Sequence, residues 1–466
     1  MLPGSHHHHP HLIFSFGKAC PGELITGFLR KIYSMSAFKK HLPALILIAF
    51  AGQGTAQEPE NNTWPEFRGN NGNGIVTGSR GLPLKWSETE NIVWKTAVEG
   101  RAWSSPVIAE EKVWITNATE DGKEMSAVCL DAKSGEILHR IPLFSNSIVE
   151  PLGNSVNGYG SPSPVIEKGR VYIHFGSYGT AAIDTSNGKV IWKRTDLPCR
   201  HFRGPGSSPV IYKNLLILTM DGVDFQYLAA LDKATGKTVW KTDRSTKWDD
   251  IEPGGKIRAG GDLRKAYTTP TFTKVGNRTI MISPGAKACF AYTPEDGKEL
   301  WYITYKGYSN ASRTVISDGH ALINTGYGKP HLVSLKLDPE ARGDITKSHI
   351  AWDIFKRVPK RSSPIVAGKE LYMTTDEGIL TCLDIASGKQ VWSDRLRGHF
   401  SASPIMADGR IYFFSQMGDC YVVKPGKTFQ LLASNKLSDG FMASPAVAGK
   451  AIYARSKSHV YRIEQK

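Results

Sequence analysis

Aromatic and basic residues recur at one kind of position in this 466-residue sequence, a few residues before the phrase Ser-Pro. Examples are Arg101-Ala102-Trp103 and His201-Phe202-Arg203. Aromatic rings stack on sugars and planar ligands, and Arg guanidinium groups bind carboxylates through paired hydrogen bonds. If the fold brings these blocks together, they predict a binding site for an anionic or glycan ligand or for a protein segment. The candidate ligand-binding residues are Trp103, Tyr159, Phe202, Arg203, Tyr267, Arg313, Arg361 and Phe400.

A structural explanation of the same residues is equally open. The aromatic side chains could fill a narrow channel while the basic side chains face water. The position of the blocks relative to one another decides between the two explanations.

The sequence offers no catalytic set. Its histidines show neither triad nor metal-ligand spacing. Asp249, Asp250, Glu252 and Asp262 cluster in a Gly-rich loop that could hold Ca²⁺, although an exposed acidic loop is the favoured interpretation. We therefore predict no catalytic residue and no metal site.

Composition excludes several classes of protein. The six cysteines include no Cys-x-x-Cys pair, so neither a small disulfide scaffold nor a cysteine-based metal site is indicated. The formal net charge is +15, but Lys and Arg are spread along the chain without a zinc finger, an RNP-like motif or a basic helix. We expect no nucleic-acid partner and no membrane span, and we expect a monomer.

The N-terminal part has the order of a secretory signal peptide. Lys39 and Lys40 precede the apolar run 42–51, and Gly54-Thr55-Ala56 supplies small residues for cleavage after Ala56. The apolar run is far shorter than the roughly 20 residues that span a bilayer. We predict that residues 1–57 are an upstream extension and signal peptide, and that the protein is periplasmic or secreted after cleavage.

A repeat organises the rest of the chain. The phrase Ser-Pro or Thr-Pro, followed by apolar residues, a turn and a second apolar run, starts at Ser105, Ser163, Ser208, Thr269, Ser363, Ser403 and Ser444. An eighth, degenerate copy is Ser312-Arg313-Thr314-Val315, in which we take Arg to replace the Pro. Successive copies lie about 40 to 60 residues apart, which is the period of a four-stranded propeller blade. The alternating strands and frequent turns predict an all-β fold, an eight-bladed β-propeller.

The second half of each repeat carries a turn followed by a tryptophan, as in Asp184 to Trp192 and Asp232 to Trp240. Asp starts the turn, Gly supplies a positive φ, and the Trp ring can lie across the neighbouring blade. We predict structural docking roles for Trp94, Trp192, Trp240, Trp301 and Trp392.

The last repeat contains only about three strands, whereas residues 91–95 near the start of the predicted mature chain look like a single outer strand. Pairing of these two parts would close the ring and remove exposed sheet edges. The predicted domain organisation is therefore a lead-in segment at 58–90 and a propeller at 91–466.

The Asp-x-x-x-Gly-Lys-x-x-Trp turns and the eightfold repeat resemble the tryptophan-docking repeats of the PQQ-like (quinoprotein-type) β-propeller family over roughly residues 64–466. The resemblance also covers the lead-in motif Trp64-Pro65-Glu66-Phe67-Arg68-Gly69. That family includes quinone-dependent alcohol dehydrogenases and cofactor-free scaffolds similar to the outer-membrane assembly factor BamB.

The resemblance implies two possible functions. A quinoprotein dehydrogenase of this family uses PQQ with Ca²⁺, an Asp base and usually a vicinal Cys-Cys pair, but no two cysteines here are adjacent. The haem-attachment motif Cys-x-x-Cys-His is absent as well. We expect an exported, non-catalytic binding or scaffolding protein without a cofactor. The alternative is a PQQ-dependent oxidoreductase acting on alcohols or sugars.

Overall fold

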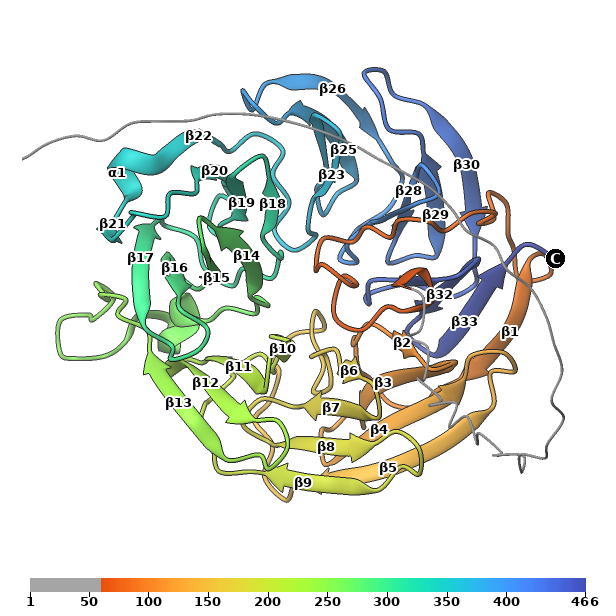
Figure 1. Ribbon diagram of the computed structural model, residues 1–466, viewed down its shortest axis with the longest axis horizontal. Helices are drawn as coiled ribbons and strands as arrows, with labels where there is room; N and C mark the ends of the chain where they lie inside the picture. The colour runs from red at the N-terminus through yellow and green to blue at the C-terminus, as the bar shows by residue number, and fades with distance from the viewer. Residues whose placement is uncertain (1–59) are drawn as a thin grey trace, which may run out of the picture. The chain divides into compact units, whose positions relative to one another are not determined.

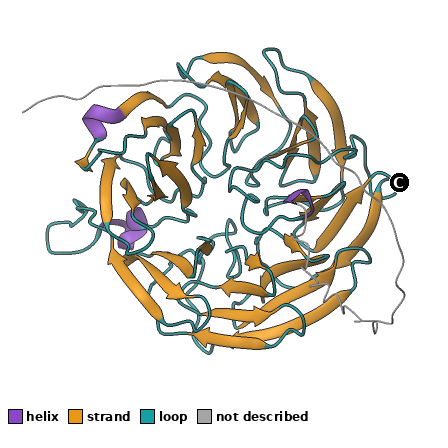
Figure 2. Cartoon of the chain, in the orientation of Figure 1, coloured by secondary structure: helices purple, strands orange, loops and turns teal. Residues whose placement is uncertain are grey.

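The computed structural model describes residues 60–466, which form a ring of eight sheets whose strands are mainly antiparallel (Figure 1). Helical structure in this part is confined to η1 (Glu60–Asn62), η2 (Arg258–Arg264) and α1 (Thr346–His349), and the strands and their connections make up the rest (Figure 2). The predicted all-β, eight-bladed propeller is confirmed. The predicted signal peptide lies outside the described residues and stays a prediction.

The first four blades follow one another along the chain, and in each the innermost strand comes first. Blade one contains β2 (Val107–Ala109), β3 (Lys112–Ala118), β4 (Glu124–Asp131) and β5 (Ile137–Ser145). Blade two contains β6 (Val165–Glu167), β7 (Arg170–His174), β8 (Thr180–Asp184) and β9 (Val190–Arg194). Blade three contains β10 (Val210–Tyr212), β11 (Leu215–Asp221), β12 (Gln226–Asp232) and β13 (Thr238–Asp243). Blade four contains β14 (Thr271–Val275), β15 (Arg278–Pro284), β16 (Ala288–Tyr292), β17 (Glu299–Thr304) and the added parallel strand β21 (Gly343–Asp344).

The last four blades complete the ring. Blade five contains β18 (Val315–Ser317), β19 (His320–Asn324), β20 (Leu332–Lys336) and β22 (Ile350–Ile354). Blade six contains β23 (Ile365–Ala367), β24 (Glu370–Thr374), β25 (Ile379–Asp384) and β26 (Gln390–Arg395). Blade seven contains β27 (Ile405–Ala407), β28 (Arg410–Phe414), β29 (Asp419–Val423) and β30 (Leu431–Lys436). Blade eight contains β31 (Ala446–Ala448), β32 (Ala451–Arg455), β33 (His459–Glu464) and, as its outermost strand, β1 (Ile92–Ala97).

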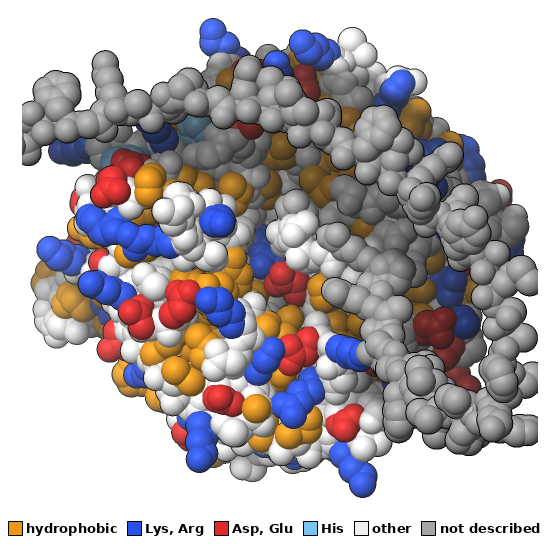
Figure 3. Space-filling view, in the orientation of Figure 1, with side chains coloured by type: hydrophobic (Ala, Val, Ile, Leu, Met, Phe, Trp, Pro, Cys, Tyr) orange, Lys and Arg blue, Asp and Glu red, His pale blue; other side chains and the backbone are white. Residues whose placement is uncertain are grey.

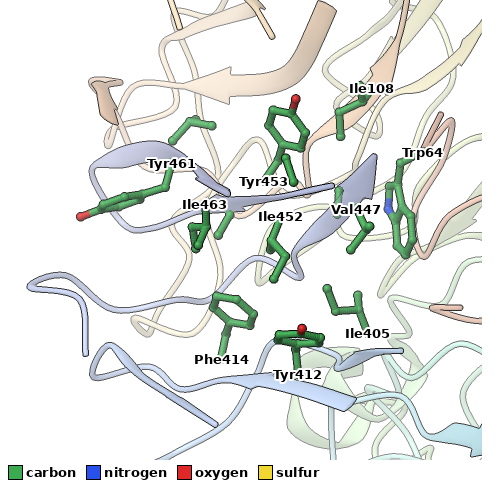
Figure 4. Close-up of a cluster of buried hydrophobic side chains, with 14 of the residues drawn as sticks. Trp64, Ile108, Ile405, Tyr412, Phe414, Val447, Ile452, Tyr453, Tyr461 and Ile463 are labelled. Carbon is green, nitrogen blue, oxygen red and sulfur yellow. The ribbon is translucent and has the colours of Figure 1, made fainter. Parts of the chain in front are cut away.

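Blade eight joins the two ends of the folded chain. Strand β1 pairs antiparallel with β33, and the register places Trp94 opposite Arg462. The predicted closure by an N-terminal outer strand is therefore confirmed. Figure 4 shows the buried cluster at this junction, where Trp64 of the lead-in segment lies near Val447, and Tyr412 and Phe414 of blade seven face Ile452 of blade eight.

Tryptophan docking links consecutive blades. The indole ring of an outer strand packs on the turn between the third and fourth strands of the next blade, where Gly236 contacts Trp192 and Gly297 contacts Trp240. The indole N–H groups donate to backbone carbonyl oxygens of these turns: Trp94 to Ala132 at 2.9 Å, Trp192 to Lys233 at 2.9 Å, Trp240 to Pro294 at 3.0 Å, Trp352 to Ile385 at 2.8 Å and Trp392 to Gly426 at 2.9 Å.

Two positions depart from this pattern. His139 takes the tryptophan position of blade one and contacts Gly188. Trp301 is buried in one cluster with Ala341 and Ile345, which belong to the inserted segment between β20 and β22. Trp352 was not among the predicted docking residues because this insertion replaces the Gly-Lys turn that normally precedes the tryptophan.

The docking contact explains the glycine at the turns that face Trp94, Trp192, Trp240 and Trp352. Gly236 has a φ of 77°, and an added Cβ would lie 2.6 Å from Cδ2 of Trp192. Gly319 has a similar φ of 70°, but a Cβ added to it would have no atom within 4 Å. We expect Gly236→Ala to lower the free energy of unfolding by about 1 to 3 kcal/mol more than Gly319→Ala, because only Gly236→Ala overpacks a blade interface. Chemical denaturation of both variants measures the difference, and equal losses would contradict a tight docking contact.

Candidate functional site

A cavity of about 360 Å³ lies at the centre of the ring. Every blade contributes to it through the segment that leads into its innermost strand. In blade order these lining residues are Trp103, Asn157, Arg203, Tyr267, Tyr308, Arg361, Ser401 and Met442. The eight segments come from separate parts of the chain, and the repeated blocks meet at this axial cavity.

The structure brings four of the eight candidate ligand-binding residues together. Trp103, Arg203, Tyr267 and Arg361 line the axial cavity. The indole N–H of Trp103 donates to the Val156 carbonyl oxygen at 3.1 Å, which holds the ring at the wall.

The other four candidates lie elsewhere. Tyr159 and Phe400 are buried at 5% and 1% exposure within blade interfaces. Phe202 lies under the Arg203 guanidinium, 4.6 Å from it, and does not line the axial cavity. Arg313 is 2% exposed and turns toward the lead-in segment.

Arg313 also corrects the assignment of the degenerate repeat. Its backbone N–H donates to Ser363 Oγ at 2.9 Å, and Val315 starts β18 as Ile365 starts β23. Arg313 therefore occupies the position of the repeat serine, and Thr314 that of the proline. The assignment made from the sequence was therefore wrong by one residue, because Ser312 resembles the serine of the repeat phrase.

Several lining residues were missed as candidates. Tyr308 belongs to a block that precedes the degenerate repeat, so the spacing of the blocks could have indicated it. Tyr327 reaches the axial cavity from the connection between β19 and β20, and Phe67 reaches it from the lead-in segment. Neither belongs to a repeated pattern, and only the tertiary structure places them there.

The walls combine aromatic rings with charged groups. Arg203 donates to the Leu152 carbonyl oxygen at 3.2 Å, and Arg361 forms an ion pair with Asp376 at 2.9 Å. Asp262 is the one carboxylate among the residues that line the axial cavity. Burial raises the pKa of Tyr267, so its phenol stays protonated and can donate a hydrogen bond at neutral pH.

A buried cation stands behind this wall. Lys265 is 1% exposed, its Nζ lies 4.5 Å from the centre of the Tyr267 ring, and it donates to the Asp221 carbonyl oxygen at 2.7 Å. The Asp221 carboxylate itself is held by Arg244 at 2.7 and 2.8 Å. Burial lowers the pKa of Lys265.

The lead-in segment crosses the ring below the axial cavity. Trp64 and Ile108 exchange backbone hydrogen bonds of 2.8 and 2.9 Å, and the Met406 N–H of blade seven donates to Gly74 at 2.8 Å. Between these attachments, Phe67 forms part of the floor of the axial cavity. The part of the lead-in segment between these attachments, residues 64–74, therefore closes this end of the axial cavity.

Two arginines fix the middle of this seal. Arg313 forms an ion pair with Glu66 at 3.2 Å and also donates to the carbonyl oxygens of Phe67 and Pro270. Arg68 donates to the carbonyl oxygens of Asn73 at 2.7 Å and Pro364 at 2.9 Å. Both arginine residues are 2% exposed, which explains the motif Trp64 to Gly69 as an anchor.

These features define the class of protein: an eight-bladed β-propeller with an axial cavity lined by aromatic, hydroxyl and guanidinium groups. A family model described as outer membrane protein assembly factor BamB matches residues 64–216 and 224–466. The chain therefore belongs to this PQQ-like propeller family.

Individual relatives are distant. The chain is 21% identical over 277 residues to outer membrane protein assembly factor BamB of Bordetella pertussis, in a match that covers 53% of this chain and 69% of that protein. BamB of Yersinia pestis is 23% identical over 206 residues, and the match covers 41% of this chain and 47% of that protein.

Solved structures show the same fold. BamB from Moraxella catarrhalis superposes with a TM-score of 0.54 at 12% identity, covering 80% of this chain and 99% of that one. Quinohemoprotein alcohol dehydrogenase from Comamonas testosteroni superposes with a TM-score of 0.60 at 13% identity, covering 88% and 81%. At such identities the similarity establishes the fold and not the activity.

The residues present do not fit a Ca²⁺-bound quinone. Ca²⁺ takes six to eight oxygen ligands, with carboxylates prominent among them. The axial cavity has one lining carboxylate, Asp262, and residues 60–466 contain no group of three or more His, Cys, Asp or Glu side chains placed to hold a metal ion. Asp250 of the predicted acidic loop pairs with Arg264 at 2.7 Å instead of facing a cation site.

The five cysteines of the described part are all unpaired and buried. Burial raises the pKa of Cys129 and Cys199 to about 12, so neither is a thiolate at neutral pH. Within residues 60–466 no helix is long and apolar enough to cross a membrane.

Proposed function

We propose that this protein is an exported, non-catalytic scaffold whose axial cavity binds a segment of a partner protein. The observation that carries the proposal is the composition of the axial cavity. Trp103, Tyr267, Tyr308 and Arg203 supply rings and a cation for binding, and Asp262 is the single lining carboxylate. Such a surface recognises a ligand without an evident means of transforming it.

Exposed apolar side chains around the axial cavity support a polypeptide partner. Connections into an innermost strand and hairpins between second and third strands leave the same end of each blade. On these connections, Ile148 is 87% exposed, Phe225 50%, Ile251 53%, Phe355 57% and Met417 57%. Large exposed apolar residues gathered at one end of a molecule are typical of protein interaction surfaces.

The relatives agree with this proposal in kind. Their name describes factors in the assembly of outer membrane proteins, a role that depends on contacts between proteins. We further propose that the protein is periplasmic or secreted after signal-peptide cleavage and that it is a monomer. Figure 3 shows positive and negative side chains interspersed over the visible face, which favours a protein partner over nucleic acid.

Arrays of synthetic hexapeptides and oligosaccharides test the proposal directly. We expect peptides to bind, and we expect Arg203→Ala and Arg361→Ala each to weaken binding by about 1.5 to 3 kcal/mol through lost charge-assisted hydrogen bonds. Arg278→Ala is the matched control, because Arg278 is exposed at the opposite end of blade four. Binding of glycans alone, or equal effects of all three substitutions, would contradict a peptide site in the axial cavity.

A further inference from the structure

The serines of the repeat phrase form a chain of hydrogen bonds between blades. The backbone N–H of Ser105 donates to Ser163 Oγ at 2.8 Å, that of Ser163 to Ser208 Oγ at 2.9 Å, and that of Ser208 to Thr269 Oγ1 at 3.0 Å. On the other side of the ring, the Ser403 N–H donates to Ser444 Oγ at 2.8 Å. Each accepting hydroxyl oxygen thus uses one lone pair to bind an N–H group of the neighbouring blade.

These hydroxyl groups also line the axial cavity. The side chains of Ser163, Ser208, Thr269 and Ser444 are buried at 1% to 7% exposure. Within residues 60–466 none of their hydroxyl hydrogens has a protein acceptor in the structure. A hydroxyl whose oxygen is engaged by an N–H donates its own hydrogen elsewhere, and here the open direction is the axial cavity. The floor therefore presents an arc of hydrogen-bond donors from blades two, three, four and eight.

Positive charge lies beneath this floor. Arg68 and Arg313 are both buried next to Phe67, and the Glu66 carboxylate pairs with Arg313. Two guanidinium groups and one carboxylate leave a net positive charge. Three guanidinium nitrogens have no hydrogen-bond partner: Arg68 Nε, Arg68 Nη1 and Arg313 Nε. Burial and the neighbouring Arg313 lower the pKa of Arg68 to about 9, so Arg68 remains charged at neutral pH. In a region of low dielectric this charge favours an anion close by.

We propose that the floor of the axial cavity is a receptor for a carboxylate of the bound protein segment. Donor hydroxyl groups would contact the carboxylate oxygens, and the buried guanidinium pair would stabilise the negative charge from below. The aromatic and basic walls would hold the residues that precede the carboxylate. This inference rests on the proposed function. It adds the identity of the group that the bound segment would place deepest in the axial cavity, a carboxylate.

The test compares hexapeptides that differ only in the end group. The best-binding free-acid hexapeptide from the array is titrated beside its C-terminal amide, with fluorescence anisotropy as the readout. We expect the amide to bind about 10- to 100-fold more weakly, because it loses the charge and one acceptor. A second pair of hexapeptides, both amidated at the C-terminus, carries Glu or Gln at the last position. Comparison of this pair shows whether the bound carboxylate comes from a side chain or from a chain terminus.

Two serine variants locate the effect. Ser208→Ala removes a hydroxyl group that lines the axial cavity and accepts the Ser163 N–H. Ser363→Ala removes an equivalent hydroxyl group, which accepts the Arg313 N–H but belongs to a residue that does not line the axial cavity. We expect Ser208→Ala to weaken the free-acid peptide at least several-fold and to leave the amide unchanged. Ser363→Ala should weaken neither, and thermal melting checks that both variants fold alike.

The outcomes separate the two proposals. Equal binding of free acid and amide, for both the terminal and the Glu/Gln pair, would overturn the carboxylate receptor and leave the protein-binding function standing. A second outcome is that no peptide binds, while inorganic phosphate raises the melting temperature of the wild type and of the Ser363→Ala variant but not that of the Ser208→Ala variant. In that case the floor binds anions, and the proposed peptide function is wrong. Absence of both effects would overturn both proposals.

Discussion

Deletion of residues 91–95 is expected to prevent the protein from folding to a stable monomer. This segment contains most of β1, the outermost strand of blade eight, and its loss exposes the edge of β33. It also removes Trp94, which is 8% exposed and donates to the Ala132 carbonyl oxygen of blade one at 2.9 Å. An open ring with an unpaired edge strand is prone to intermolecular pairing. Size-exclusion chromatography and thermal melting measure the outcome, which should be aggregation and loss of the cooperative transition.

A deletion of residues 253–255 is the control. These residues lie in an exposed loop between β13 and β14, outside every strand. We expect the control to remain monomeric with nearly unchanged melting. If the 91–95 deletion behaves like this control, closure by β1 does not stabilise the ring.

Replacement of Trp240 by Ala is expected to lower the free energy of unfolding by about 3 to 5 kcal/mol. Its side chain is 9% exposed, contacts Gly297 of blade four and donates to the Pro294 carbonyl oxygen at 3.0 Å. The substitution leaves a cavity between two blades and an unpaired carbonyl group. Equilibrium unfolding in urea, followed by circular dichroism, gives the magnitude.

Val239→Ala provides the comparison on the same strand. Val239 is adjacent to Trp240 but points away from the blade interface and is 52% exposed. We expect its substitution to change the free energy of unfolding by less than about 0.5 kcal/mol. A loss for Trp240→Ala of well under 1 kcal/mol would mean that tryptophan docking contributes little to blade packing.

The sequence was sufficient for the architecture because the repeat is strongly periodic. Each Ser-Pro phrase marks the start of an innermost strand, and each Gly-x-x-x-Trp turn marks an interface between blades. The position of Trp94 also predicted the closure, since a lone outer strand at one end complements three strands at the other. Trp352 escaped the pattern because the insertion at 337–349 replaces the usual turn.

The axial cavity was predictable only in part. The repeat places Trp103, Arg203, Tyr267 and Arg361 at the mouth, but periodicity does not determine which way a side chain turns. Arg313 turns to the opposite end because Glu66 and the Phe67 carbonyl oxygen, more than 240 residues earlier in the chain, receive its hydrogen bonds. The contribution of Phe67 to the floor depends on the same long-range contact, which no local pattern contains.

Equilibrium dialysis of the purified full chain against PQQ and Ca²⁺ tests the central claim most directly. The binding-protein account predicts that the protein retains no quinone above the level of a non-specific control protein, because one carboxylate in the axial cavity is too few for a Ca²⁺ site. Stoichiometric uptake of the quinone, reversed by a Ca²⁺ chelator and accompanied by dye reduction with an alcohol or sugar, would contradict that account and identify a quinoprotein oxidoreductase.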